Sequence, residues 1–154
     1  MSSITHRLNS YKRPRGISAR QHAVSSAHVE NAGFIAVISF HGKIPDGSEG
    51  KSHAEFVTLQ CVEAIARLDA ICIIIDFRDV QYQWGNSLLR VFDTLRKHLY
   101  YEWHDVKGAT PVKLLASDKS AGLYSLIGNP NMFFETMEAA IESCGSDLEL
   151  WLPE

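Results

Sequence analysis

The sequence predicts an α/β domain with a mixed, mostly parallel central sheet, an opening antiparallel hairpin and flanking helices. An unbroken apolar run at residues 71–75 is typical of a strand covered on both faces. Such runs alternate with amphipathic helical stripes in the order ββαβαβα(β)α, which favours parallel strands joined by right-handed crossovers. Two strand-like segments, 23–29 and 34–40, flank AsnAlaGly at 31–33 and indicate a hairpin. With 154 residues, 45% of them hydrophobic, the chain fits one domain.

The first two helices follow from apolar spacing. A loop at 42–50, with three glycines and a proline, precedes the first helix, and Ser52 is placed to cap it. The apolar stripe of this helix contains Ala54, Val57, Cys61, Val62, Ile65 and Leu68. The strand that begins at Ile71 is expected to end at Asp76. The polar turn 81–85 then leads into a second helix that fades near Tyr101, with an apolar stripe of Leu88, Leu89, Val91, Phe92 and Leu95.

The C-terminal third repeats the alternation. GlyAlaThrPro at 108–111 ends the second helical region, and residues 112–116 have the pattern of a buried strand. Ser117 or Asp118 is expected to cap a short helix that ends at Gly128. A brief last strand at 132–134 precedes a final helix with Met137, Ala140, Ile141 and Cys144 on one face. Residues 148–152 alternate in hydrophobicity, which is consistent with an edge strand or with a segment that lies on a partner.

Charge separates an N-terminal tail from the body of the chain. The first 20 residues contain no acid and five basic residues, which are Arg7, Lys12, Arg13, Arg15 and Arg20. The other residues hold 10 basic and 18 acidic side chains, a net charge of −8. We expect residues 1–22 to be a basic, flexible arm and residues 23–154 to form the single domain. The acidic body disfavours nucleic acid as a partner, because five tail charges alone bind it weakly.

Several classes of site and location are disfavoured by what the sequence lacks. No apolar run approaches the roughly 20 residues that cross a bilayer, and the N-terminus has no secretion-signal pattern, so the sequence predicts a cytoplasmic protein without membrane insertion. Cys61, Cys72 and Cys144 lie within apolar patterns and are expected to be reduced core thiols. The histidines show no ligand spacing and the phosphate-binding glycine motifs are missing, so no metal and no cofactor are expected.

Three segments carry a family resemblance. They are PheHisGlyLysIleProAsp at 40–46, IleIleIleAspPheArgAspValGlnTyr at 73–82, and a closing run with LeuIleGly, PhePheGluThr and GluAlaAlaIle between 126 and 141. Together they resemble the STAS domains, the modules found in anti-sigma factor antagonists and at the cytoplasmic ends of sulphate transporters. The resemblance covers roughly three quarters of the chain, from about residue 29 to 144. It implies a STAS-like fold and a regulatory role through protein binding.

The chain departs from this family at the helix after the central strand. In the phosphorylated antagonists an Asp-Ser pattern followed by Gly-Leu opens that helix, and a partner kinase modifies the serine. Alignment on Asp76 and Leu88 places Trp84 over the aspartate and Gly85 over the serine. The resemblance therefore implies that the usual phosphorylation switch is absent, because glycine has no hydroxyl.

The surface formed by residues 82–90 and the loop 42–51 is the predicted partner-binding surface. Its candidate residues are Tyr82, Trp84, Gly85, Asn86, Ser87 and Arg90. Large rigid aromatics often anchor interfaces, although the same rings could pack over the helix end instead. The sequence thus predicts a non-enzymatic regulatory module that binds a protein partner or a second copy of itself.

Two alternatives remain open. A phospho-switched antagonist would use Ser87 as its phosphosite, because phosphate is favoured near a helix N-terminus, whereas Asn86 or Ser87 would otherwise simply cap the helix. A small crotonase-like enzyme or ligand-binding protein would use backbone donors of the turn at Gly85. The candidate polar groups for such a site are Asp76, Asp79, His53 and His41.

Overall fold

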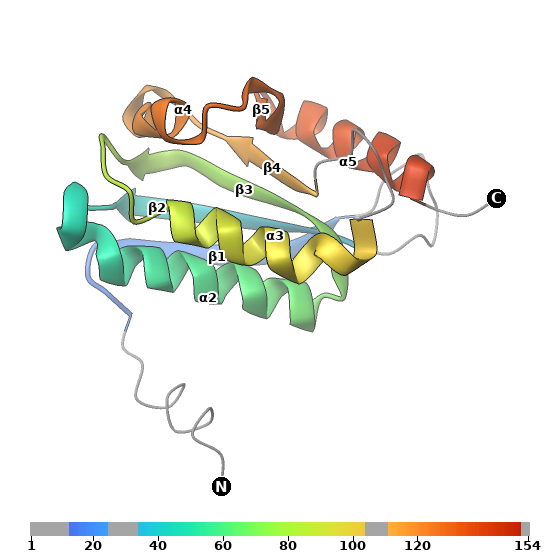
Figure 1. Cartoon of the computed structure of the whole chain (residues 1–154), viewed down its shortest axis with the longest axis horizontal. Helices are drawn as coiled ribbons and strands as arrows, with labels where there is room; N and C mark the ends of the chain where they lie inside the picture. The colour runs from blue at the N-terminus through green and yellow to red at the C-terminus, as the bar shows by residue number, and fades with distance from the viewer. Residues whose placement is uncertain (1–12, 25–33, 104–110, 152–154) are drawn as a thin grey trace, which may run out of the picture.

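A central five-stranded sheet, in the order β1-β2-β3-β4-β5, organises the domain. The computed structural model describes residues 13–24, 34–103 and 111–151. The strands are β1 (Ile17–Val24), β2 (Phe34–Lys43), β3 (Ala70–Gln81), β4 (Val112–Leu115) and β5 (Phe133–Phe134). The helices are α2 (Lys51–Arg67), α3 (Leu89–Trp103), α4 (Gly122–Ile127) and α5 (Met137–Trp151). Figure 1 shows α2 and α3 side by side, with α5 at the other end of the sheet beside β4 and β5.

The strand pairing confirms the predicted fold class. β1 runs antiparallel to β2, whereas β2, β3, β4 and β5 pair in parallel. Phe56 of α2 packs edge-on against Phe40 of β2, whose ring also lies 5.2 Å from that of Phe77 in β3. On β3, side chains alternate between faces, so Cys72 points away from this aromatic cluster and contacts Cys144 of α5. The sheet is therefore covered by α2 and α3 on one face and by α5 on the other.

The opening of the chain differs from the expectation. β1 begins at Ile17, whose side chain is 4% exposed, so residues 17–22 belong to the sheet and not to a flexible arm. The sequence of β1 is too polar to indicate a strand, because only one side of an edge strand needs to be apolar. The rest of the predicted strand 23–29, the turn 31–33 and arm residues 1–12 lie outside the described residues.

The predicted loop at 42–50 is more ordered than expected. β2 continues to Lys43, and residues Gly47–Gly50 form a 3₁₀ helix that leads directly into α2. Gly50 occupies the N-cap of α2, so the prediction that Ser52 caps this helix is wrong. Its hydroxyl lies 3.5 Å from the Nδ1 atom of His53.

β3 also extends beyond the predicted exit at Asp76 and ends at Gln81. Ser39 of β2 pairs with Asp76, and His41 pairs with Asp79. Two steps along β2 therefore match three steps along β3, and the extra residue of β3 forms a bulge. The bulge lets a strand continue after a charged residue, because it allows Arg78 and Asp79 to avoid the core while Phe77 and Val80 on either side are buried.

The C-terminal elements largely match the expectation. The Ser117 side chain accepts a hydrogen bond from the Lys119 amide and caps a 3₁₀ helix, Asp118–Ser120, before α4, and Gly128 ends α4 in a left-handed conformation. A further 3₁₀ helix, Pro130–Met132, precedes β5. The option of an edge strand at 148–152 is wrong for the described residues, because α5 continues to Trp151 and buries Leu148.

Candidate functional site: the groove between α2 and α3

The turn between β3 and α3 is held from inside by Tyr82. Its side chain is 2% exposed, and its hydroxyl donates a 2.5 Å hydrogen bond to the Gly85 carbonyl. The backbone N–H of Tyr82 donates to the Lys119 carbonyl, and its own carbonyl accepts from the N–H of Gly122. Tyr82 therefore fixes the turn to the start of α4. Of the two alternatives for the Tyr82 ring, exposure to a partner or packing over the helix end, the structure shows packing.

Two glycines from separate segments meet at this turn. Gly85 has φ +135°, and a Cβ atom at this position would lie 2.9 Å from the Gly47 nitrogen. The Gly47 N–H donates to the Trp84 carbonyl over 3.2 Å, and the Ser87 hydroxyl donates to the Gly47 carbonyl over 3.2 Å. We call this set of contacts between Gly47 and residues 84–87 the glycine clasp. It ties the start of α3 to the loop that precedes α2.

Trp84 lies on the outside of the glycine clasp. Its ring packs over Gly47, where a Cβ atom would lie 3.0 Å from the ring. The side chain nevertheless remains 63% exposed. A large aromatic ring is thus held in a defined place at the surface, where it is available for contact with another surface.

A groove of about 1240 Å³ runs between α2 and α3 beside this ring. The helix α2 contributes Lys51, Glu55 and Thr58, and the other wall includes Trp84, Arg90 and Thr94. Gly47, Ser48, Gly85, Asn86 and Ser87 complete the end of the groove nearest the clasp. The groove therefore combines an apolar ring with two cations and one carboxylate.

The structure brings most of the predicted site residues together. Trp84, Gly85, Asn86, Ser87 and Arg90 all line the groove, and Gly47, Ser48 and Lys51 represent the predicted loop 42–51. The sequence did not identify Glu55 and Thr58 of α2. Their helix reads as an ordinary amphipathic stripe, and only the placement of α3 beside it reveals which part of its polar side faces a groove.

The polar groups proposed for a catalytic alternative lie elsewhere. The Nε2 atom of His53 is 2.9 Å from the Arg15 carbonyl, near the start of β1. His41 pairs with Asp79 in the sheet register. Asp76 lies on the sheet face that α5 covers. None of the four is among the residues that line the groove.

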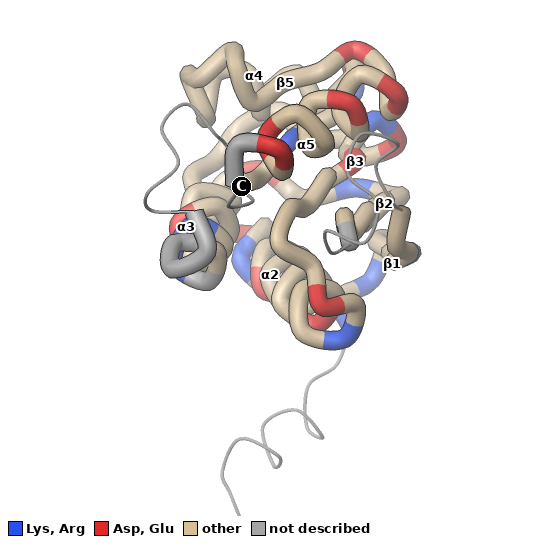
Figure 2. Tube along the Cα trace, turned by 90° about the vertical axis from the view of Figure 1, so that its right-hand side faces the viewer, with Lys and Arg blue, Asp and Glu red and all other residues tan. Residues whose placement is uncertain are grey.

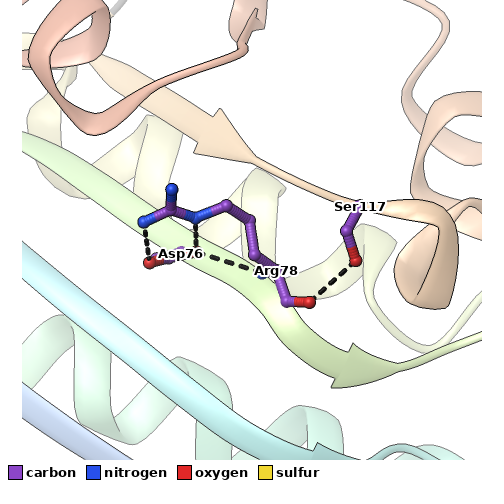
Figure 3. A network of polar contacts seen from close by, with 3 residues as sticks. All are labelled: Asp76, Arg78 and Ser117. Carbon is purple, nitrogen blue, oxygen red and sulfur yellow. Dashed lines mark hydrogen bonds and ion pairs between the residues drawn. The ribbon is translucent and has the colours of Figure 1, made fainter.

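Asp76 belongs to a separate polar network (Figure 3). The Arg78 guanidinium donates to both carboxylate oxygens of Asp76, at 3.0 and 2.9 Å, and the Ser117 hydroxyl donates to the Arg78 carbonyl over 2.7 Å. The hydrogen bond to Asp76 raises the pKa of Arg78 above its ordinary value. The bond from Ser117 joins β3 to the segment after β4, and the bonds from Arg78 account for Asp76 without a role in the groove.

Charge is distributed differently on the two faces of the sheet. The helix α5 carries four acidic residues and no basic one, and Figure 2 shows acidic positions along it. The groove instead has a small excess of positive charge from Lys51 and Arg90 over Glu55. No helix in the described ranges is long and apolar enough to cross a membrane. Within those ranges, no three His, Cys, Asp or Glu residues lie together as metal ligands would.

Comparisons with known proteins identify the fold. No family model matches the sequence, and no curated protein matches it. Among solved structures, the anti-sigma factor antagonist SpoIIAA in its unphosphorylated form is similar, with a TM-score of 0.54, 16% identity, and coverage of 81% of this chain and 94% of that one. An anti-sigma factor antagonist from Mycobacterium paratuberculosis is similar with a TM-score of 0.50, 15% identity, and coverage of 82% and 94%. The chain has a STAS-like fold.

Proposed function

We propose that this protein is a non-enzymatic regulatory module that binds a protein partner through the groove between α2 and α3. The observation that carries the proposal is Trp84, which is held over Gly47 by the glycine clasp and is 63% exposed at the groove. Tryptophan and arginine are enriched among residues that dominate binding energy, and a ring that is fixed before binding loses little entropy on association. Arg90 lies in the same groove.

The charges in the groove indicate the chemistry of the partner segment. Lys51 and Arg90 outnumber Glu55, although the chain as a whole is acidic. A partner segment that covers Trp84 with an apolar side chain and places carboxylates near the two cations would be complementary to the groove. Such charges act mainly on the association rate and on specificity.

The backbone at Gly85 supports binding without the family's serine switch. In the alignment given by the family resemblance, Gly85 takes the place of the phosphorylated serine. Its φ of +135° and its contact with the Gly47 nitrogen leave no room for a side chain. Regulation would then come from the availability of the partner and not from phosphorylation at this position.

The groove chemistry supports a non-enzymatic role. Its described lining includes one carboxylate, Glu55, and no histidine or cysteine. General acid–base and nucleophilic catalysis most often use such groups in pairs at hydrogen-bonding distance. A binding role requires only the exposed ring and the flanking charges.

The test is affinity capture from the native host, with the wild type and the Trp84→Ala variant at matched expression. We expect a stoichiometric protein partner on the wild type and a loss of about 2 kcal/mol or more in its affinity for Trp84→Ala, with nearly unchanged thermal unfolding. Tyr124→Ala is the matched control, because Tyr124 is another exposed aromatic, 49% exposed on α4. The proposal fails if Trp84→Ala retains the partner, or if it loses stability in proportion to affinity.

A further inference from the structure

Two buried thiols meet between β3 and α5. Cys72 and Cys144 are 72 positions apart in sequence, and the Cys72 thiol donates a 2.8 Å hydrogen bond to the Cys144 sulfur. Both side chains are fully buried. A disulfide has an S–S distance of about 2.05 Å, so the two sulfurs are less than about 1 Å from bonding distance. Sequence spacing gave no indication of this pair.

The third cysteine provides an internal comparison. Cys61 is also fully buried, but it belongs to α2 on the opposite face of the sheet. Burial raises the pKa of the Cys61 thiol above its usual range. Cys61 therefore has the burial of the other two cysteines without belonging to their pair.

The surroundings of the pair keep it reduced while α5 is docked. Burial raises the pKa of Cys72, as does its hydrogen bond to Cys144, so the thiol stays protonated at neutral pH. Lys113 of β4 acts in the other direction, because its charge lowers the pKa of Cys72. The same Lys113 forms a buried 2.5 Å ion pair with Asp147, one turn after Cys144 on α5. This pair holds α5 over the thiols and shields them from solvent.

We propose that Cys72 and Cys144 form a reversible disulfide when the protein meets a peroxide, and that this bond locks α5 to the sheet. When α5 lifts, one thiol loses its proton and its sulfur attacks hydrogen peroxide. The S–O bond forms and the O–O bond breaks, so that the cysteine becomes a sulfenic acid. The departing hydroxide takes up the proton that the thiol lost and becomes water. When α5 docks again, the sulfur of the other cysteine attacks the sulfenic sulfur. The S–S bond forms, the S–O bond breaks, and the hydroxyl group leaves with the proton of that thiol as a second water. The two sulfurs together supply the two electrons that reduce the peroxide, and a dithiol reductant reverses the change.

The disulfide would crosslink the last helix to the middle of the sheet. It would close a long loop, which is the case in which a crosslink most restricts the unfolded chain. Because α5 covers the face opposite to the groove, this proposal does not depend on the proposed partner binding.

The experiment uses the reduced full chain treated with hydrogen peroxide and then alkylated under denaturing conditions. We expect a mass decrease of about 2 Da before alkylation, one alkylated thiol, and a peptide map that links Cys72 to Cys144. The midpoint of thermal unfolding should rise by about 5–10 °C and return after reduction. Oxidation should accelerate in sub-denaturing urea, because release of α5 controls access to the thiols.

Cysteine variants distinguish a specific disulfide between Cys72 and Cys144 from non-specific oxidation of the thiols. Cys61→Ser should still lose about 2 Da, whereas Cys72→Ala and Cys144→Ala should not. The wild-type peptide map decides the matter even if a variant folds poorly. A disulfide that includes Cys61, three alkylated thiols after prolonged exposure, or oxygen adducts without a crosslink would each overturn the proposal.

Discussion

The backbones of Gly47 and Gly85 approach so closely that a Cβ atom on Gly85 would lie 2.9 Å from the Gly47 nitrogen. This contact joins the loop before α2 to the turn before α3. It also brings Trp84 over Gly47, with the ring at the end of the groove. Gly85 thus has a structural role, because its lack of a side chain leaves room for the Gly47 backbone.

Gly85→Ser tests this role directly. We expect the free energy of unfolding to fall by about 2 kcal/mol or more, because serine is strained at φ +135° and its Cβ would contact the Gly47 backbone. Urea unfolding of the variant and the wild type measures the loss. The introduced side chain would therefore weaken the turn.

Gly128→Ser is the matched control. Gly128 also has a positive φ, +60°, but nothing lies within 4 Å of the place where its Cβ would be. We expect this variant to lose only about 1 kcal/mol, the cost of the left-handed backbone alone. Equal losses at the two glycines would show that the contact with Gly47 contributes nothing.

The sequence predicted the order of elements because apolar periodicity reports which side of each element is buried. The run at 71–75 identified the central strand in this way, since both of its faces meet helices. The same signal failed for β1, where the antiparallel pairing with β2 supplies the backbone hydrogen bonds and few apolar side chains are needed. It also misplaced the end of β3, because a bulge after Asp76 is a property of pairing and not of composition.

Only those parts of the candidate site that are neighbours in the sequence could be predicted. The residues at 84–87 stood out because a turn precedes an amphipathic helix there. The contacts of these residues with Gly47 join positions about 40 residues apart, and no local pattern encodes them. The pairing of Cys72 with Cys144 is equally non-local. The sequence left packing and exposure of the Tyr82 ring as alternatives, and the backbone bonds of Tyr82 to Lys119 and Gly122, which accompany its packing, are non-local as well.

The buried ion pair of Lys113 and Asp147 should be costly to break. Lys113→Ala leaves the Asp147 carboxylate without its cation in a largely dry environment, so we expect a loss of about 3–5 kcal/mol in unfolding free energy. Chemical denaturation measures it. Arg96→Ala is the control, because Arg96 is paired at 4.0 Å with Asp93 on the exposed surface of α3 and should cost less than about 1 kcal/mol. Similar losses for the two variants would contradict a structural role for the buried pair.

Alkaline pH should destabilise the fold, because it favours ionisation of thiol and phenol groups that are buried in the folded chain. Burial raises the pKa of Cys61, Cys72 and Tyr82, and the carboxylate of Asp46 raises that of Tyr82 further. These groups bind protons more tightly in the folded chain than in the unfolded chain. Their contribution is therefore fully present below the unfolded pKa values, about 8.5 for cysteine and about 10 for tyrosine, and is lost as the pH rises through the folded values.

Urea unfolding of the reduced protein between pH 7 and pH 10 measures this loss. We expect a fall of about 3–4 kcal/mol over that range, about 2 kcal/mol from each of the two thiols. Cys61→Ala should show a shallower fall, because the variant has one buried thiol fewer. A slope identical to that of the wild type would show that Cys61 ionises as easily in the folded chain as in the unfolded one.

Ser87 provides the last test, because its hydroxyl is the hydrogen-bond donor to the Gly47 carbonyl in the glycine clasp. Ser87→Ala should lose about 1 kcal/mol in unfolding free energy, the ordinary contribution of one hydrogen bond. Ser87→Asp should lose more, since a carboxylate has no proton to donate and would face the carbonyl oxygen. Ser48→Asp is the control, because Ser48 lines the same groove without this bond to Gly47. If Ser87→Asp is as stable as the wild type, the glycine clasp tolerates negative charge at Ser87, and its hydrogen bond to Gly47 is then no argument against a phosphate at this position.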